Sequence, residues 1–206
     1  MFKTLTFLLC TTLISGTDKC RLPVPLTPTA SCGSQQTMFN EGECLCCYYD
    51  TENIPTIGIG FNLERGDAAE VMTKYNLTLE NVLKDCQDKT TNHCLTDADA
   101  KDIFNETYSK SEQCVDKYSP GLPPAKRAAI IDVALAGCAT LKQFVKMQDA
   151  LNKQDWKTAA DELRNSSWCE QVGKNRCDSN YNCIAGGKGC TGQTCATGSD
   201  VSRWIY

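Results

Sequence analysis

Carboxylates are the side chains of this sequence that best support a chemical role. Glu41 is followed by a glycine, Asp50 comes nine residues later, and Thr56 follows after six more. Hydrolysis of a glycosidic bond requires two carboxyl groups. One must be protonated to donate to the leaving oxygen, and the other must be ionised to activate water or attack the sugar. The region around Glu41 therefore contains the residue types that glycosidase chemistry needs.

Other reaction classes find little support. The chain has no glycine-rich phosphate-binding loop. Its single histidine, His93, follows the polar stretch 90–92 and is expected to be a solvated loop residue rather than a base. His93 has only Cys94 beside it, so a structural zinc site is not predicted. Oxidative pairing would consume the cysteines, which leaves none as a nucleophile. We therefore expect neither a metal nor a cofactor.

The first residues and the cysteine content predict secretion. Lys3, the apolar run 5–14 and the small residues 15–16 are typical of a secretory signal peptide over residues 1–16. A buried N-terminal helix or a membrane anchor is the alternative. The chain has 15 cysteines, one of them inside that segment, and the remaining even number allows up to seven disulfides of open connectivity. We expect an extracellular protein, or one in the lumen of a digestive, lysosome-like compartment.

Charge and length limit the partners. The 206 residues suit one domain, and their net charge is −4, or about −5 once Lys3 is removed. An acidic chain of this kind argues against nucleic-acid binding and against a cationic, membrane-disrupting peptide. No apolar run reaches the roughly 18 residues that span a bilayer. We expect a monomer that does not insert into membranes.

The elements that must position the carboxylates are a helix and a hairpin. Residues 17–36 form a Pro- and Cys-containing extension, and a short helix over 34–41 is expected to stop at Gly42. Strands over 45–50 and 56–61 should follow, joined by a turn that contains Asn53. Glu41 would then meet the negative end of a helix dipole, which disfavours its charged form, as a general acid requires.

The rest of the chain is predicted to be helical. Helices are expected over 67–75, over 78–86, from Thr96 onward, from Pro124 to about Gly137, over 141–151 and over 155–164. Segment 128–136 is apolar apart from Asp132, which indicates a buried central helix. Residues 169–198 show little helical periodicity and are expected to form a disulfide-bound tail. The prediction is a disulfide-rich α+β domain, with a small N-terminal sheet lobe packed on a mainly helical lobe.

The spacing around the two carboxylates also carries a family resemblance. Phe39-Asn40-Glu41-Gly42, Tyr49-Asp50 and the run Thr-Ile-Gly-Ile-Gly at 56–60 are similar to the signature of the bacteriophage-type lysozymes. That signature has a Glu-Gly pair, an Asp nine residues later and a Thr six residues after the Asp. Weaker similarity continues to Arg176. The resemblance implies a lysozyme-like catalytic domain over 37–176, followed by a Cys- and Gly-rich tail over 177–206.

The resemblance implies a role for each site residue. Glu41 would be the general acid, Asp50 would position or activate water, and Thr56 would orient that water. Arg176 would pair with the catalytic glutamate, the alternative being a surface arginine. The expected reaction is cleavage of the β-1,4 bond between N-acetylmuramic acid and N-acetylglucosamine in bacterial peptidoglycan, with inversion, which requires carboxyl groups about 6.5–9.5 Å apart. The alternative for Glu41 is a solvated helix-end carboxylate.

Some residues depart from the family pattern, and others near it are expected to have no catalytic role. Phe61 stands where a histidine is common, so it can support the site without a charge pair. Ala136 replaces a polar residue that would touch the substrate. Glu43 and Glu52 are expected to face solvent, and Trp168 is expected in the core. These departures leave a second hypothesis open, a catalytically silent peptidoglycan-binding protein. The enzyme hypothesis predicts wall lysis for antibacterial defence or for digestion.

Overall fold

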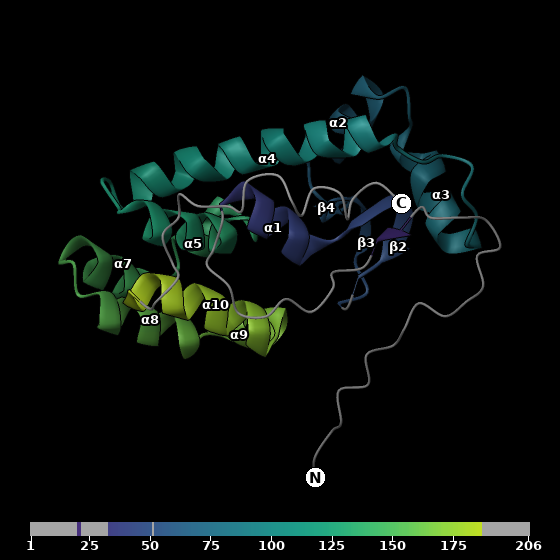
Figure 1. Ribbon diagram of the computed structural model, residues 1–206. Coiled ribbons are helices and arrows are strands. Elements are labelled where there is room, and N and C mark those ends of the chain that lie inside the picture. Colours follow the sequence, from purple (N-terminus) through teal and green to yellow (C-terminus); the bar gives the residue numbers. More distant parts are fainter. Residues whose placement is uncertain (1–19, 22–32, 51, 187–206) are drawn as a thin grey trace, which may run out of the picture.

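The computed structural model describes residues 20–21, 33–50 and 52–186 (Figure 1). The predicted signal peptide over 1–16, most of the extension over 17–36 and the last part of the expected tail, 187–206, lie outside the described residues.

The chain forms one small antiparallel sheet, and the hairpin predicted after the first helix is part of it. Its strands are β1 (Cys20–Arg21), β2 (Glu43–Tyr49), β3 (Pro55–Gly58) and β4 (Phe61–Asn62), in the order β1-β2-β3-β4. The expected single strand over 56–61 is wrong, because the chain turns back between β3 and β4. Gly58 and Gly60 take φ of 66° and 69°, values that other residues rarely adopt, and so allow this second turn.

The helices match the predicted pattern closely in the first half of the chain. They are α1 (Ser34–Glu41), α2 (Ala68–Lys74), α3 (Leu79–Asp88), α4 (Asp97–Tyr118), α5 (Pro124–Ala134), α6 (Cys138–Leu141), α7 (Val145–Asn152), α8 (Trp156–Arg164), α9 (Ser167–Val172) and α10 (Lys174–Ala185). The helix expected from Thr96 begins with a capping box, in which Thr96 and Asp99 each bind the other's main-chain N–H.

Two helical predictions need correction. The helix expected over 141–151 is two helices, because Phe144, with φ −80° and ψ 57°, interrupts the helical path between α6 and α7. The expected tail after Trp168 begins with α9 and α10, so helix continues to Ala185. The inward residues of α10 include two cysteines and Asn180, residue types that indicated disulfides and solvent rather than a buried helical face.

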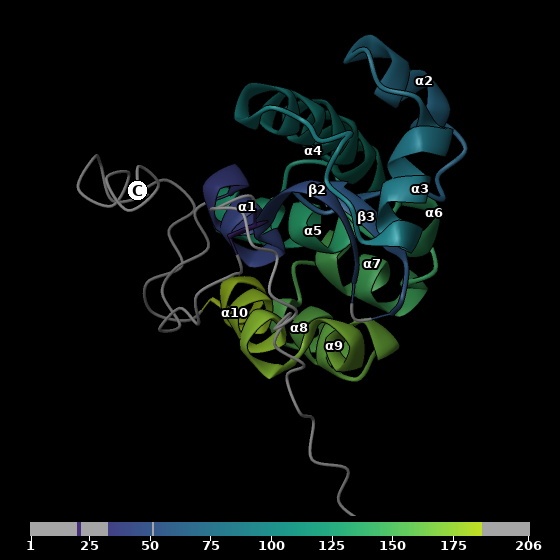
Figure 2. The same cartoon turned by 90° about the vertical axis from the view of Figure 1, so that its right-hand side faces the viewer.

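The elements form two lobes connected by the long helix α4, which confirms the predicted α+β architecture. In Figure 1, α4 runs along the top, the strands gather at the right, and α7 to α10 lie at the lower left. Helix α4 packs on both β3 and α5, and α10 packs on α5 and α8. Figure 2 shows β2 and β3 below α4 and above the group α8–α10. The central helix α5 is buried from Ala128 to Ala134, as predicted, but it ends before the last two residues of segment 128–136, of which Ala136 is exposed.

Five disulfides link ten of the described cysteines, and three of these bridges hold β2; the buried Cys183 is in none of the five. The pairs are Cys20–Cys44, Cys46–Cys94, Cys47–Cys86, Cys114–Cys138 and Cys169–Cys177. The bridges on β2 reach β1, α3 and the loop that precedes α4, so they fix the strand that connects Glu41 to Asp50. Cys32, Cys190 and Cys195 lie outside the described residues.

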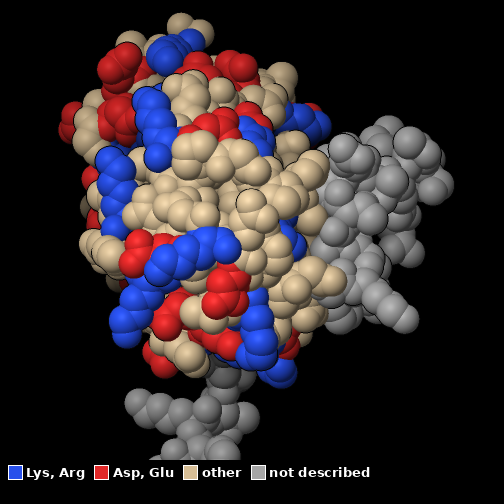
Figure 3. Space-filling view, turned by 90° about the vertical axis from the view of Figure 1, so that its left-hand side faces the viewer, with Lys and Arg blue, Asp and Glu red and all other residues tan. Residues whose placement is uncertain are grey.

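Basic and acidic side chains are intermingled on the face of the molecule opposite to the one seen in Figure 2. Figure 3 shows lysine, arginine and acidic side chains interspersed there above and below a band of uncharged residues. No helix among the described residues combines the length and apolarity needed to cross a membrane.

Candidate active site

Glu41 is the last residue of α1, and its two carboxylate oxygens have different surroundings. Gly42 ends the helix with φ 71° and sends the chain directly into β2. Oε1 accepts a hydrogen bond of 2.6 Å from Nη2 of Arg176. Oε2 lies against Gly60, where an added Cβ would be only 2.7 Å away. No described residue donates a hydrogen bond to Oε2, so this oxygen can carry a proton and present it to a ligand.

Arg176 comes from α10, far along the chain, and donates hydrogen bonds to a buried carboxylate as well as to Glu41. Its Nε and Nη2 donate to Oδ2 and Oδ1 of Asp132 at 2.9 and 3.1 Å. Nδ2 of Asn180 donates to the same Oδ2 at 2.7 Å. Burial opposes the charge of Arg176, but Asp132 and Glu41 outweigh it and raise the guanidinium pKa above its ordinary value. Arg176 is therefore a fixed cation.

Asp50 directly follows β2 and is fixed by the turn that it starts. Its Oδ1 accepts main-chain N–H bonds from Glu52 and Ile54, both of 2.9 Å. Its own N–H donates to the Ile54 carbonyl at 3.0 Å. Both side-chain bonds end on Oδ1, and within the described part of the chain nothing donates to Oδ2. One carboxylate oxygen thus anchors the side chain while the other can hold a water.

Thr56 and Tyr48 face each other across the hairpin beside these carboxylates. They are register partners on β2 and β3. Thr56 is buried, and its hydroxyl donates to the carbonyl of Ile54 at 3.1 Å. Burial, followed by the negative charges of Glu41 and Asp50, raises the pKa of Tyr48 above its ordinary value. A neutral phenol therefore lies close enough to both carboxylates for their charges to act on it, and no sequence motif indicates this contact.

The other residues singled out from the sequence lie in the core or at the surface. Phe61 is 4% exposed in the core, with the Arg65 guanidinium 4.9 Å from its ring centre. Trp168 is buried, as predicted, and Glu52 is exposed, as predicted. Ala136 is an exposed residue after α5.

The expectation that Glu43 faces solvent is wrong. Its side chain is 5% exposed, because β2 is an inner strand with β1 on one side and β3 on the other. A charged residue next to a turn suggested an open edge, whereas the pairing with β1 covers this position.

His93 lies in a loop, as predicted, but contacts a buried carboxylate. Asp85 accepts hydrogen bonds from the Thr90 hydroxyl and from the main chain of His93, and the His93 ring nitrogen lies 3.2 Å away. Burial alone raises the pKa of Asp85, but these hydrogen bonds outweigh it and hold that pKa below its usual value. This cluster orders the loop that carries Cys94. It is remote in sequence from Glu41 and Asp50.

Two residues of the site were not identified from the sequence. In the sequence, Asp132 stands out only as the one charged residue of an apolar segment, and Asn180 lies in the segment predicted to be a tail. A lone acidic residue on a buried helix is itself a signal, because a buried charge needs a partner. The partner could not be named without the helix α10.

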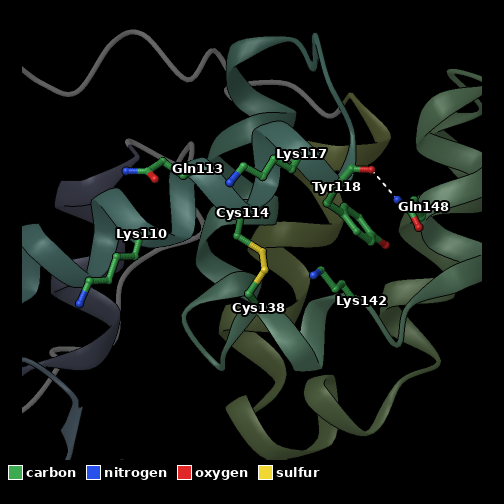
Figure 4. A pocket seen from close by; sticks show the side chains of 8 residues that line it. All are labelled: Lys110, Gln113, Cys114, Lys117, Tyr118, Cys138, Lys142 and Gln148. Carbon is green, nitrogen blue, oxygen red and sulfur yellow. Dashed lines mark hydrogen bonds between the residues drawn. A yellow bond between two sulfur atoms is a disulfide. The ribbon is translucent and has the colours of Figure 1, made fainter. Parts of the chain in front are cut away.

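A separate hollow of about 480 Å³ lies among α4, α6 and α7 (Figure 4). The disulfide Cys114–Cys138 forms part of its wall, and in Figure 4 the side chain of Lys117 lies above that bridge and that of Lys142 to its right. None of its lining residues is acidic, so it lacks the paired carboxyl groups that glycoside hydrolysis needs. The arrangement around Glu41 and Asp50 is therefore the better candidate.

The comparison with known families covers the segment of the chain in which this site lies. A family model described as phage lysozyme matches residues 39–179. The matched segment is more than half of the chain, and it contains Glu41, Asp50, Thr56, Asp132 and Arg176. A search of curated proteins found no match.

Proposed function

Because the chain belongs to the phage lysozyme family, we propose that it hydrolyses the β-1,4 bond between N-acetylmuramic acid and N-acetylglucosamine in bacterial peptidoglycan. Membership of this family supports muramidase-type glycoside hydrolysis in general. The proposal rests on one observation in particular. Glu41 and Asp50 each have one oxygen anchored and one oxygen without a hydrogen bond from any described residue.

Glu41 would act as the general acid. Arg176 fixes Oε1, and Oε2, beside Gly60, would carry the proton that is given to the glycosidic oxygen. The bond between the anomeric carbon and that oxygen breaks as the oxygen takes the proton, and the sugar develops positive charge. Glycine at position 60 leaves room for the carboxyl group and the leaving oxygen where any side chain would collide with them.

Asp50 would act as the base that prepares the attacking water. Its Oδ2 accepts a proton from water as the water oxygen bonds to the anomeric carbon, while Oδ1 stays bound to the main chain of the turn. Thr56, on the adjoining strand, would help to orient this water. Attack by water on the face opposite the leaving group inverts the anomeric carbon.

The protein would act outside the cytosol. Five disulfides among the described cysteines support an oxidising compartment. We propose that it lyses bacterial walls as a secreted monomer, in antibacterial defence or in digestion.

Product analysis tests the reaction. Purified peptidoglycan is incubated with the protein, the products are reduced with borohydride, and the new reducing ends are identified by mass spectrometry. We expect these ends to be muramic acid. Proton NMR of the products before reduction should show that the first-formed anomer is inverted. Glucosamine at the new ends would contradict the bond assignment. Sedimentation with the wall without any new ends would favour the silent binding protein.

A further inference from the structure

One arginine serves two carboxylates in this site. Asp132 accepts two hydrogen bonds from Arg176, in a forked arrangement, and Glu41 accepts one. The side chain of Asp132 is 3% exposed, that of Arg176 15% and that of Glu41 23%. Asp132 is thus the buried, tightly held partner, and Glu41 is the one that reaches toward solvent.

The charges of these groups bear on the proton of Glu41. An arginine that faced Glu41 alone would favour the ionised carboxylate, because an opposite charge close by stabilises it. A protonated Glu41 would then leave a buried guanidinium without a counter-charge, which is costly. Asp132 supplies a counter-charge that does not depend on Glu41. With Asp132 ionised, the three groups are neutral together when Glu41 holds its proton.

We propose that Asp132 is a positioning residue that orients and neutralises Arg176, so that Arg176 holds Glu41 in place while Glu41 keeps the proton for catalysis. Asn180 completes this arrangement, because its amide donates a hydrogen bond to Oδ2 of Asp132 and so helps to fix the carboxylate. The catalytic use of that proton rests on the proposed function. The arrangement of charges does not.

Four other residues are considered with Glu41, and none of them carries a positive charge. Tyr48 on β2 is a phenol whose charged form is disfavoured by burial and by both carboxylates. Asp50, after β2, is a second negative charge that also acts on that phenol. Gly60 contributes only main chain, and Trp168 on α9 lies with its ring centre 5.8 Å from the Arg176 guanidinium carbon. Arg176 is therefore the cation whose charge must be compensated.

A titration of the unaltered protein tests the charge arrangement without any need for activity. Side-chain carboxyl groups are labelled with carbon-13 and followed by NMR from neutral to acidic pH. We expect Asp132 to stay ionised throughout the range in which Glu41 takes up its proton. Proton uptake at Asp132 while Glu41 remains ionised would overturn the proposal.

A pair of variants tests the effect on catalysis. In Asp132→Asn the counter-charge is lost, so the alkaline limb of the kcat/KM profile should move to lower pH by roughly one unit. Asp132→Glu keeps the charge and should keep the limb in place, even where kcat falls. A purely structural role would lower activity in both variants without moving the limb.

The matched control is Asp116→Asn. Asp116 also accepts two hydrogen bonds from one arginine, Arg127, at 2.8 and 2.9 Å, but on the outer face of α4. This variant should leave the pH profile unchanged. An unmoved limb in Asp132→Asn would refute the inference while activity of the wild type upheld the proposed function. If Asp132→Asn does not fold, the NMR titration of the wild type still decides. If the wild type is inactive, the proposed function fails and the same titration remains the test.

Discussion

Replacing Gly60 by alanine should disable the site with only a modest loss of stability. The new Cβ would lie 2.7 Å from Oε2 of Glu41, 3.1 Å from its carboxyl carbon and 3.2 Å from its Cγ. Rotation of the carboxyl group alone cannot relieve three contacts at once, and Arg176 restrains the other oxygen. The end of the Glu41 side chain must therefore retreat.

The size of the effect follows from the geometry. Ordinary contact for a Cβ begins at 3.4 Å, so Oε2 must move by several tenths of an ångström, and displacements approaching 1 Å at a reacting group cost up to about 100-fold in rate. We expect kcat/KM to fall by roughly 10- to 100-fold. The left-handed backbone, with φ 69°, costs alanine about 1–2 kcal/mol, which lowers Tm by about 2–8 °C for a domain of this size.

Two other glycines separate backbone strain from the contact with Glu41. Gly121 has φ 75° and no atom within 4 Å of an added Cβ, and Gly58 has φ 66° with its Cβ against Leu95 and Ala100. Alanine at either position should lower Tm but leave the rate of reducing-end release from purified peptidoglycan within about threefold of wild type. If Gly60→Ala is as active as Gly121→Ala, the proposed position of Glu41 is wrong.

Three further changes have definite expected outcomes. Tyr48, whose pKa is raised by burial and by the two nearby carboxylates, should stay neutral in the folded protein above its usual value of about 10, so stability is lost as pH rises beyond that value. When tyrosine ionisation is followed by its absorbance at alkaline pH, the curves of the wild type and Tyr48→Phe should therefore coincide until the protein unfolds. Asp85→Asn should lower the free energy of unfolding by about 1–3 kcal/mol at neutral pH, measured in urea. Because the folded-state pKa of Asp85 is depressed, the difference should shrink as pH falls below about 4, and a constant difference would contradict this. Replacing Cys46 and Cys94 together by serine removes a bridge across a separation of 48 residues and should cost about 2–4 kcal/mol, measured by thermal unfolding. An unchanged Tm would refute the role given to this disulfide in fixing β2.

The local signals in the sequence were sufficient for much of the fold. The helix ending at Glu41, the capped helix from Thr96 and the buried helix after Pro123 each have a cap, a proline or a glycine beside a clear periodicity. The turn at Gly60 was missed because an alternating apolar run continues through it, and only the positive φ values reveal the break.

The site could be predicted only where its residues are close in sequence. One helix and the hairpin after it carry Glu41, Asp50 and Thr56, so the spacing of these residues in the sequence indicates that they lie close together. Asp132 and Asn180 meet through the packing of α10 on α5, which no local pattern encodes. The register of β2 against β1, which buries Glu43, is likewise a contact between distant segments.

The central claim is that Glu41 donates the proton that allows the glycosidic bond to break. Its most direct test compares Glu41→Gln with Glu52→Gln, an exposed carboxylate in the same hairpin, by the initial rate of reducing-end release from purified peptidoglycan. We predict that Glu52→Gln matches the wild type and that Glu41→Gln loses about 100-fold or more. Release by Glu41→Gln at a rate close to that of wild type would contradict the account.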